Sequence, residues 1–278
     1  MFCLHSIRFV PNFVAVAVGL AWLGHARAFA SDPWADGVIE YTSGDNGSIE
    51  YSDPVVALGT PERDTGESAG FPGPVTPFNP AWRPDEIVSI GPGGSLTVQF
   101  DEPIVDSASN AFGVDLIVFG NGQFIDGPNF DGTVSGLFAD GPMQVSVSAD
   151  GVNFVALPGD FGDALFPTLG YLDLDGPYAA GPGAVLSDFR KPIDPSLTLD
   201  DLLGLSFAEL VAVYDGSGGG IPIDIAASGL SQVSYVRVTV GDGASSVEID
   251  GFAAVPEPGT ALMVALLVCV RRVGGGRE

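Results

Sequence analysis

Short strand-like runs separated by turn residues fill the sequence between residues 32 and 254, and the whole chain carries 39 glycines and 22 prolines. Apolar and polar residues alternate in Ser95–Phe100 and in Met143–Ser148, as in strands with one face in a core and one in water. Asp150-Gly151 then leads the chain into Phe154–Leu157, which is typical of a β-hairpin. Because no segment repeats at a fixed period, a β-propeller is disfavoured.

One further run, Val114–Phe119, is apolar at nearly every position, which indicates a central strand covered on both faces. Helical signals are weak: Asp53-Pro54 can start a turn of helix that reaches Leu58, and Thr198–Leu203 can form another. We therefore predict an all-β chain, a single β-sandwich of jelly-roll type with long loops. The remaining predicted strands are Val38–Tyr41, Phe207–Tyr214, Val233–Val240 and Ser246–Ala253.

The N-terminus has the order of elements found in a secretory signal peptide. Arg8 supplies positive charge, Phe13–Leu23 is an apolar run, and Ala28-Phe29-Ala30 places small residues where signal peptidase cuts. We predict a signal helix in residues 1–30 and Ser31 as the first residue after cleavage. A buried N-terminal helix is the alternative.

The C-terminus contains Pro256-Glu257-Pro258, then the apolar run Ala261–Val270, then Arg271-Arg272. The prolines end any strand or helix, and the cations would stay on the cytoplasmic side of a membrane. This order resembles the PEP-CTERM sorting signal of Gram-negative bacteria that make exopolysaccharide. The resemblance implies a sorting motif at Pro256, Glu257 and Pro258 and processing by an exosortase, a membrane transpeptidase-like enzyme. A plain hydrophobic terminal strand or helix is the alternative.

The apolar run of this tail is short for a membrane anchor. Its ten residues, 261–270, would span roughly 15 Å as a helix, about half of a hydrocarbon core of ~30 Å. We therefore predict that residues 255–278 hold a short hydrophobic helix with transient membrane contact, a processed or degenerate signal and not a lasting anchor.

Removal of both ends restricts the available chemistry. The two cysteines are Cys3 and Cys269, and the two histidines are His5 and His25, so all four lie in the predicted signal peptide or tail. The predicted domain, residues 31–254, then contains neither residue type. This excludes a disulfide framework, a cysteine nucleophile and a Ser-His-Asp triad within it, and it disfavours a zinc site.

The same domain is strongly acidic. Of the chain's 35 Asp and Glu residues only Glu257 and Glu278 lie outside it, whereas five of the 10 Lys and Arg residues do, which leaves a net charge of about −28. Such a surface repels nucleic acid and anionic lipid. It suits calcium, which takes oxygen ligands, and it equally suits simple solvation outside the cell.

Two segments resemble a second family. Val145–Phe154 is similar to the hairpin of galactose-binding-like domains, including the discoidin type, and Tyr235–Val238 with Val247–Phe252 is similar to their closing strands. The resemblance implies a jelly roll with a binding edge formed by loops, often with a structural calcium. The long segments before Pro84 and between Pro158 and Pro195 have no counterpart in this family pattern.

Acidic and amide side chains in the predicted loops make calcium a candidate cofactor. The candidate ligands are Asn121 and Asp126 after the central run, Asp215 before the glycine-rich segment 216–220, and Asp224. The alternative is chance clustering among the 33 acidic residues. The glycine-rich segment has no P-loop lysine, so we expect a flexible hairpin loop there and no phosphate site.

Aromatic residues in loop-like sequence make a sugar-binding face the second candidate site. Sugar binding needs flat aromatic rings beside polar groups in a concavity. The candidates are Trp34, Trp82, Phe124, Phe130 and Tyr178. The alternative is that each of these rings packs in the core or holds a long loop.

A glycan-active hydrolase or lyase is the alternative function, because paired carboxylates can act as acid and base without histidine. Glu248-Ile249-Asp250 resembles the start of laminarinase-type signatures but lacks their second glutamate. We therefore expect a non-enzymatic protein of the cell surface or outer envelope of a Gram-negative bacterium, with binding or structural roles. Its expected partners are signal peptidase, an exosortase and a glycan or surface protein, and not nucleic acid.

Overall fold

The computed structural model describes residues 32–45, 47–66, 72–139, 141–159, 161–162 and 165–257. These residues belong to one compact unit that starts at Asp32. The predicted signal peptide and the tail from Pro258 onward lie outside the described residues, so their roles stay predictions. In the described part, no helix combines the length and apolar character that a membrane crossing requires.

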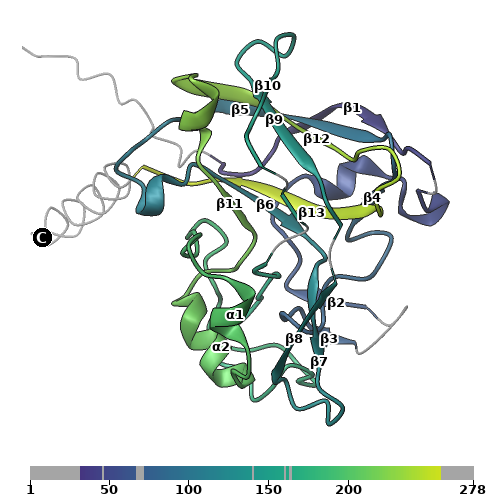
Figure 1. The fold of residues 1–278 in the computed structure, drawn as a ribbon, viewed down its shortest axis with the longest axis vertical. Helices are drawn as coiled ribbons and strands as arrows, with labels where there is room; N and C mark the ends of the chain where they lie inside the picture. The colour runs from purple at the N-terminus through teal and green to yellow at the C-terminus, as the bar shows by residue number, and fades with distance from the viewer. Residues whose placement is uncertain are drawn as a thin grey trace, which may run out of the picture. The chain divides into compact units, whose positions relative to one another are not determined.

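Two antiparallel sheets form the predicted β-sandwich (Figure 1). The chain passes from one sheet to the other at each step from β4 to β5, to β6, to β9, and again from β10 to β11, to β12 and to β13, as in a jelly roll. The larger sheet has the order β1 (Gly37–Thr42), β5 (Ser95–Val105), β12 (Gln232–Thr239), β9 (Gln144–Ser148) and β10 (Val155–Ala156). The smaller sheet has the order β11 (Ile221–Ile223), β6 (Leu116–Gly120), β13 (Val247–Ala254) and β4 (Val88–Ile90).

The main core lies between these sheets. Leu96 and Val98 on β5 lie opposite Val238 and Val236 on β12, and none of these four side chains is exposed. They belong to one cluster that also takes in residues of β4, β6, β9, β11 and β13. Burial of this apolar surface is the main stabilising contribution to the sandwich.

Strand β6 is covered on both faces, as the apolar run predicts. Leu116 and Val118 belong to the main core. Phe119 points to the opposite face, where its ring centroid lies 5.3 Å from that of Phe189 and where Ile117 is also buried. The outer face of the smaller sheet is therefore a second packing surface.

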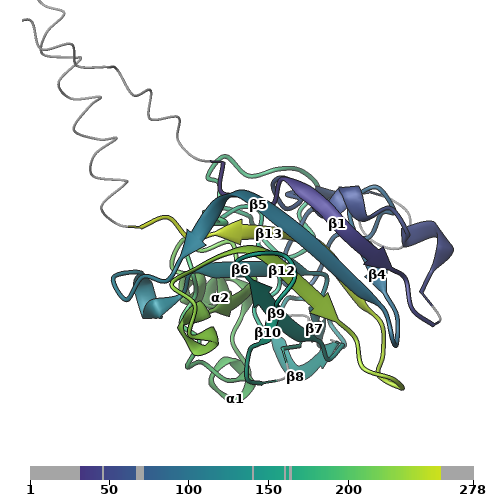
Figure 2. The ribbon, with the colours of Figure 1, turned by 90° about the horizontal axis from the view of Figure 1, so that it is seen from above.

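The long loops build a layer with its own hydrophobic core, beyond the single sandwich that the sequence predicts (Figures 1 and 2). In Figure 1 its helices and the β7–β8 hairpin lie below the two sheets. Its elements are β2 (Asp64–Thr65), β3 (Gly73–Pro74), β7 (Gln123–Asp126), β8 (Val134–Ala139), α1 (Leu199–Leu202) and α2 (Phe207–Tyr214). Among the described residues there are also four 3-10 turns: η1 (Ile49–Tyr51), η2 (Pro54–Ala57), η3 (Ala111–Gly113) and η4 (Ile225–Ser228).

The prediction of a strand at Phe207–Tyr214 is wrong, because this segment is helix α2. Phe207, Leu210 and Tyr214 are its buried residues, a spacing of three and four that fits a helix. Ser206 and Glu209 form a capping box, in which each side chain bonds the backbone N–H of the other. The turns of helix expected near residues 54 and 199 are confirmed as η2 and α1.

The prediction of a flexible loop at residues 216–220 is also wrong, since Ser217 to Gly220 are buried. Ser217 pairs with Asp188 in a β-bridge, and the N–H of Gly220 donates to the carbonyl of Phe166 at 2.7 Å. Gly220 has a φ of 87°, and a Cβ there would overlap Cγ2 of Ile117. The glycines allow the backbone to lie directly against β6.

The predicted hairpin between β9 and β10 is confirmed. Asp150 caps its turn by accepting the N–H groups of Val152 and Asn153 at 2.9 and 2.8 Å, and these bonds hold the pKa of Asp150 well below its usual value. Gly151 has a φ of 72° and lies against the ring of Tyr235, where a Cβ would come within 3.0 Å. Asp150 therefore stabilises the turn by hydrogen bonds, and Gly151 fits the positive φ and the close contact with Tyr235.

Candidate functional site

A cavity of about 350 Å³ lies in the loop-built layer, between the turn at residues 78–82, strand β7 with the loop after it, and residue 178. Four of the five aromatic residues predicted to bind ligand line this cavity: Trp82, Phe124, Phe130 and Tyr178. Its remaining lining includes Phe78, Asn79, Gln123, Ile125, Asp126, Gly127 and Pro128. Residues from three separate segments thus meet around one concavity.

The floor of the cavity is part of the loop-built core. Phe124 is 1% exposed and Phe78 is 4% exposed, and their ring centroids lie 5.8 Å apart. Phe124 also packs against Phe138 at 5.2 Å. Almost all of the Phe124 surface is therefore buried by core packing, which is the alternative that the sequence left open for this residue. The Phe124 ring forms part of the floor of the cavity.

The rim carries the accessible rings. Phe130 is 65% exposed and has a φ of 52°, a conformation that is uncommon for a residue with a side chain. Trp82 and Tyr178 are half-buried. The backbone of Trp82 is fixed, because its N–H lies 3.0 Å from Oε2 of Glu86 and its carbonyl accepts the hydroxyl of Tyr51 at 2.8 Å. This rim presents aromatic surface to a ligand.

Tyr178 and Asp126 form the polar wall. The Tyr178 hydroxyl donates to Oδ2 of Asp126 at 3.1 Å, and the same carboxylate accepts N–H groups from Gly127 at 2.6 Å and from Gly132 at 3.0 and 3.1 Å. Burial, and then the charge of Asp126, raises the pKa of Tyr178 well above its usual value. The hydroxyl therefore stays protonated and remains a donor.

The fifth predicted aromatic, Trp34, lies elsewhere. It forms an isolated β-bridge with Ala253, and its ring packs edge-on against Phe189 at 6.5 Å. It belongs to the packing on the outer face of β6 and does not line the cavity.

The four predicted calcium ligands do not come together. Asp215 forms an ion pair with Lys191 at 2.8 Å, Asp126 holds the loop after β7, and Asn121 lies at the start of the β6–β7 connection. Asp224 instead lies near two acids that the sequence reasoning did not select, Asp106 and Asp115. Asp115 had a detectable signal, because it is the one charged residue in the apolar run 114–119.

The carboxylates behind the hydrolase alternative lie outside the cavity. Asp250 is 2% exposed and accepts the N–H of Glu62 at 3.2 Å, and burial raises its pKa well above the usual range. Glu248 accepts the hydroxyl of Ser89 at 3.0 Å. Among the described residues that line the cavity, Asp126 is the single carboxylate, so the cavity lining supplies no acid–base pair.

Sequence reasoning missed Phe78, Asn79 and Gln123. The first two lie in Thr76-Pro77-Phe78-Asn79-Pro80, where two prolines flank an aromatic and an amide residue. Backbone bonds between Thr76 and Asn79 close this turn at 3.0 Å. The paired prolines were the available signal that this segment is a rigid turn.

The chain matches no family model and no curated protein sequence. Comparison with solved structures finds carbohydrate-binding modules. One is a pectin-binding module with 8% identity and a TM-score of 0.25, covering 60% of this chain and 70% of that one.

Two others belong to the class called CBM32. The module of AlyQ, solved in complex with 4,5-unsaturated mannuronic acid, has 10% identity and a TM-score of 0.28, and the match covers 79% of this chain and 96% of that one. A module from a family 31 glycoside hydrolase of Clostridium perfringens has 10% identity and a TM-score of 0.29, covering 82% and 99%. At these TM-scores the similarity gives no information about the function of this chain.

Proposed function

We propose that this protein is a non-enzymatic glycan-binding protein of the cell surface, and that it binds a sugar in the cavity between Trp82, Phe130 and Tyr178. The observation that carries the proposal is the meeting of these aromatic rings with Asn79, Gln123 and Asp126 around one concavity. Its volume of about 350 Å³ falls at the lower end of the range for small-molecule pockets, which fits one or two sugar rings.

The chemistry of the lining matches a sugar. The C–H face of a pyranose ring packs on a flat aromatic ring, and Trp82 and Phe130 offer such faces at the rim. Hydroxyl groups need donors and acceptors at fixed positions, which the half-buried amide of Gln123 and the carboxylate of Asp126 supply. The carboxylate disfavours anionic sugars, so a neutral or amino sugar is the expected class.

The proposal includes export and sorting. The order of elements at the two ends of the chain supports signal peptidase and an exosortase as processing partners, with a cell-surface or outer-envelope destination in a Gram-negative bacterium. Strand β13 ends at Ala254, and Pro256 and Glu257 directly after it are exposed. A processing enzyme could therefore reach the start of the motif without unfolding the sheet.

The binding role is tested with the purified protein on a glycan array, beside a Trp82→Ala variant. We expect binding to a limited set of glycans and its loss in the variant. Wild-type failure on all glycans, or equal binding by the variant, would overturn the proposal. Release of reducing ends or unsaturated products from the bound glycans would instead support the hydrolase or lyase alternative.

Sorting is tested by intact-mass analysis of the protein recovered from its native host. We expect a chain that starts at Ser31 and lacks residues 271–278. Recovery of a chain that retains those residues would contradict processing of the tail.

A further inference from the structure

The described lining of the cavity carries a negative charge and no positive charge. The negative charge is the carboxylate of Asp126 at the end of β7, and the described lining includes no lysine, arginine or histidine. Salt bridges between the described residues do not include Asp126, because their cations pair with other acids. These cations are Arg83, Arg190, Lys191 and Arg237. A cationic ligand would therefore supply the opposite charge that the described side chains do not.

The donors that hold Asp126 are neutral groups. The carboxylate accepts the N–H of Gly127 at Oδ1, and it accepts the N–H of Gly132 at both of its oxygens. The hydroxyl of Tyr178 donates to Oδ2. A carboxylate offers about four acceptor positions, and three donors serve them here. Asp126 can therefore accept a further hydrogen bond, and a charged donor would make the stronger one.

Three aromatic residues line the cavity together with this carboxylate. Trp82 and Tyr178 are half-buried, and Phe130 is exposed. An ammonium group within about 6 Å of the face of an aromatic ring is attracted to its electron density, most strongly at tryptophan. A hydroxyl group at the same place gains a hydrogen bond to the carboxylate without this attraction. The combination of rings and carboxylate therefore favours a cation over a neutral group of similar size.

The charge of the whole predicted domain acts in the same direction. Residues 31–254 have a net charge of about −28. A field of this sign attracts cationic ligands and repels anionic ones. This long-range attraction speeds association, whereas the contacts inside the cavity determine where the cation is held.

We propose that the cavity binds a sugar through a protonated amine, which donates hydrogen bonds to Asp126 and packs against the aromatic rings of the rim. Such binding rests on the proposed sugar-binding function, and it narrows the expected class from neutral or amino sugars to sugars with a free amine. The hydroxyl groups of the sugar meet the amide of Gln123, which also lines the cavity. N-acetylation would remove the charge of the amine and add bulk in a cavity of about 350 Å³.

Calorimetry with matched disaccharides tests the ligand class. The probes are the disaccharides of glucosamine and of galactosamine. Each is compared with its N-acetylated form and with the neutral disaccharide that has a hydroxyl group at the same carbon. We expect the free amine to bind about tenfold more tightly than both counterparts. The difference should shrink when sodium chloride is raised from about 50 mM to about 500 mM, because salt screens the interaction.

Two results of these measurements would separate the ligand class from sugar binding itself. Equal affinities for the amine and its neutral counterparts, or array binding confined to neutral glycans, would overturn the amine proposal and leave sugar binding in place. Failure on every glycan would overturn the proposed function as well.

The variant Asp126→Asn locates the amine. Asparagine keeps an oxygen that can accept the N–H groups of Gly127 and Gly132, and it removes the negative charge. We expect the affinities for the free amine and for its N-acetylated form to come within about twofold of each other in this variant. Thermal melting checks that the variant is folded, and the disaccharide comparison on the unaltered chain does not depend on it.

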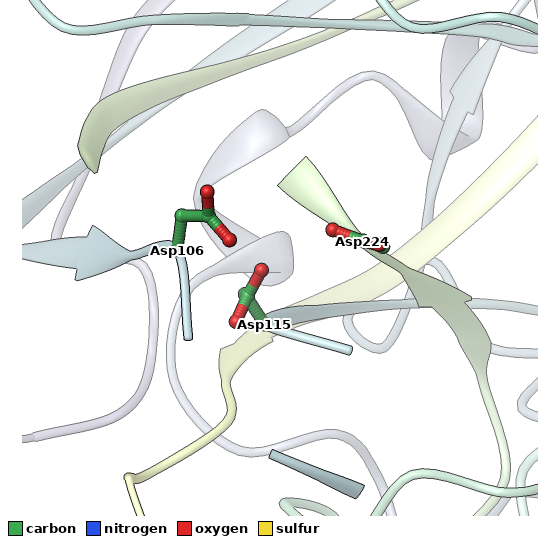
Figure 3. Close-up of side chains that lie close together, drawn as sticks. All are labelled: Asp106, Asp115 and Asp224. Carbon is green, nitrogen blue, oxygen red and sulfur yellow. The ribbon is translucent and has the colours of Figure 1, made fainter. Parts of the chain in front are cut away.

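The matched control is Asp224→Asn, in a group of acids outside the cavity. Asp224 also accepts a backbone N–H, that of Ala226 at 2.8 Å. Figure 3 shows it with Asp106 and Asp115, and the three residues form an acid cluster in which one carboxylate oxygen from each lies within 4.8 Å of the others. General attraction of amines to acidic surface would therefore be strong at this cluster.

We expect Asp224→Asn to keep the tenfold preference for the free amine that Asp126→Asn loses. An unchanged preference in Asp126→Asn would overturn the proposal. An equal loss of preference in both variants would also overturn it, because the amine would then be attracted by the acidic surface in general and not held in the cavity.

Discussion

The hydroxyl of Tyr178 donates to a carboxylate oxygen of Asp126 at 3.1 Å and joins segments that are 52 residues apart in the sequence. Asp126 ends β7, and Tyr178 lies in the long segment between β10 and α1. Both residues line the cavity, so this bond holds its polar wall together. The N–H groups of Gly127 and Gly132 also hold the carboxylate, so a sugar in the cavity would meet a wall that the Tyr178 hydroxyl completes.

Tyr178→Phe should therefore weaken glycan binding as well as stability. Loss of a hydrogen bond to a charged, half-buried acceptor costs about 1–2 kcal/mol of unfolding free energy. We expect the dissociation constant for the bound glycan to rise several-fold, measured by calorimetry. The matched control is Tyr171→Phe. The Tyr171 hydroxyl donates to a carboxylate oxygen of Asp64 over a distance of 2.8 Å, and neither residue lines the cavity. The control should lose stability and keep its affinity.

The stability of the EDTA-treated protein should be greatest at mildly acidic pH. Burial raises the pKa of Asp250 well above 3.8 and also raises the pKa values of Asp115, Glu62 and Glu248. A raised folded pKa means that the unfolded state releases its proton first, so stability falls as the pH rises above about 4. The lowered pKa of Asp150 acts in the opposite direction and removes stability as the pH falls below about 4.

Thermal melts in EDTA between pH 3 and pH 9 check this expectation. We expect the melting temperature to peak near pH 5 and to decline toward pH 8. Asp250→Asn removes the acid whose pKa burial raises furthest above its usual value, and it should flatten the decline. A melting temperature that rises steadily from pH 5 to pH 8 would show that these carboxyls are not buried in solution.

Ser206→Ala should destabilise the chain by about 1 kcal/mol, because Ser206 caps α2 and bonds Glu209. Urea unfolding measures this difference. Ser196→Ala is a control in the same region, since the Ser196 hydroxyl bonds only its near neighbour Asp194 at 2.7 Å on the surface. We expect a smaller effect there, and equal effects would contradict the role of the cap.

Gly220→Ala should destabilise the chain more than Gly229→Ala. Both glycines have positive φ, 87° and 72°, so both substitutions add backbone strain of about 1 kcal/mol. Only at Gly220 would the new methyl group overlap the side chain of Ile117, whereas nothing lies within 4 Å at Gly229. Equal melting temperatures for the two variants would contradict the close packing of this segment on β6.

The sandwich was predictable because its strands obey local rules. The alternation in Ser95–Phe100 places Leu96 and Val98 in the main core, and the apolar run at β6 reflects the packing of both its faces. Helix α2 was mistaken for a strand because Phe207–Tyr214 is apolar at most positions, which makes its period ambiguous. The Ser206–Glu209 capping box was the local signal that separates the two cases.

The candidate sites were predictable in residue type and only partly in position. Of the aromatic residues in loop-like sequence, Trp82, Phe130 and Tyr178 line the cavity, but no local pattern shows that their three segments meet there. Trp34 could not be separated from them, since its distance from the cavity depends on tertiary packing against Phe189. The acid cluster depends on the register of β11 against β6, which no local pattern contains.

Sugar binding at the rim of the cavity is tested most directly by calorimetry with matched phenylalanine variants. Phe130 and Phe112 are both exposed, at 65% and 56%, and both have positive φ, at 52° and 59°, but only Phe130 lines the cavity. For the glycan with the strongest array signal, Phe130→Ala should raise the dissociation constant about tenfold or more, whereas Phe112→Ala should leave it unchanged. Equal dissociation constants for the two variants would contradict the claim.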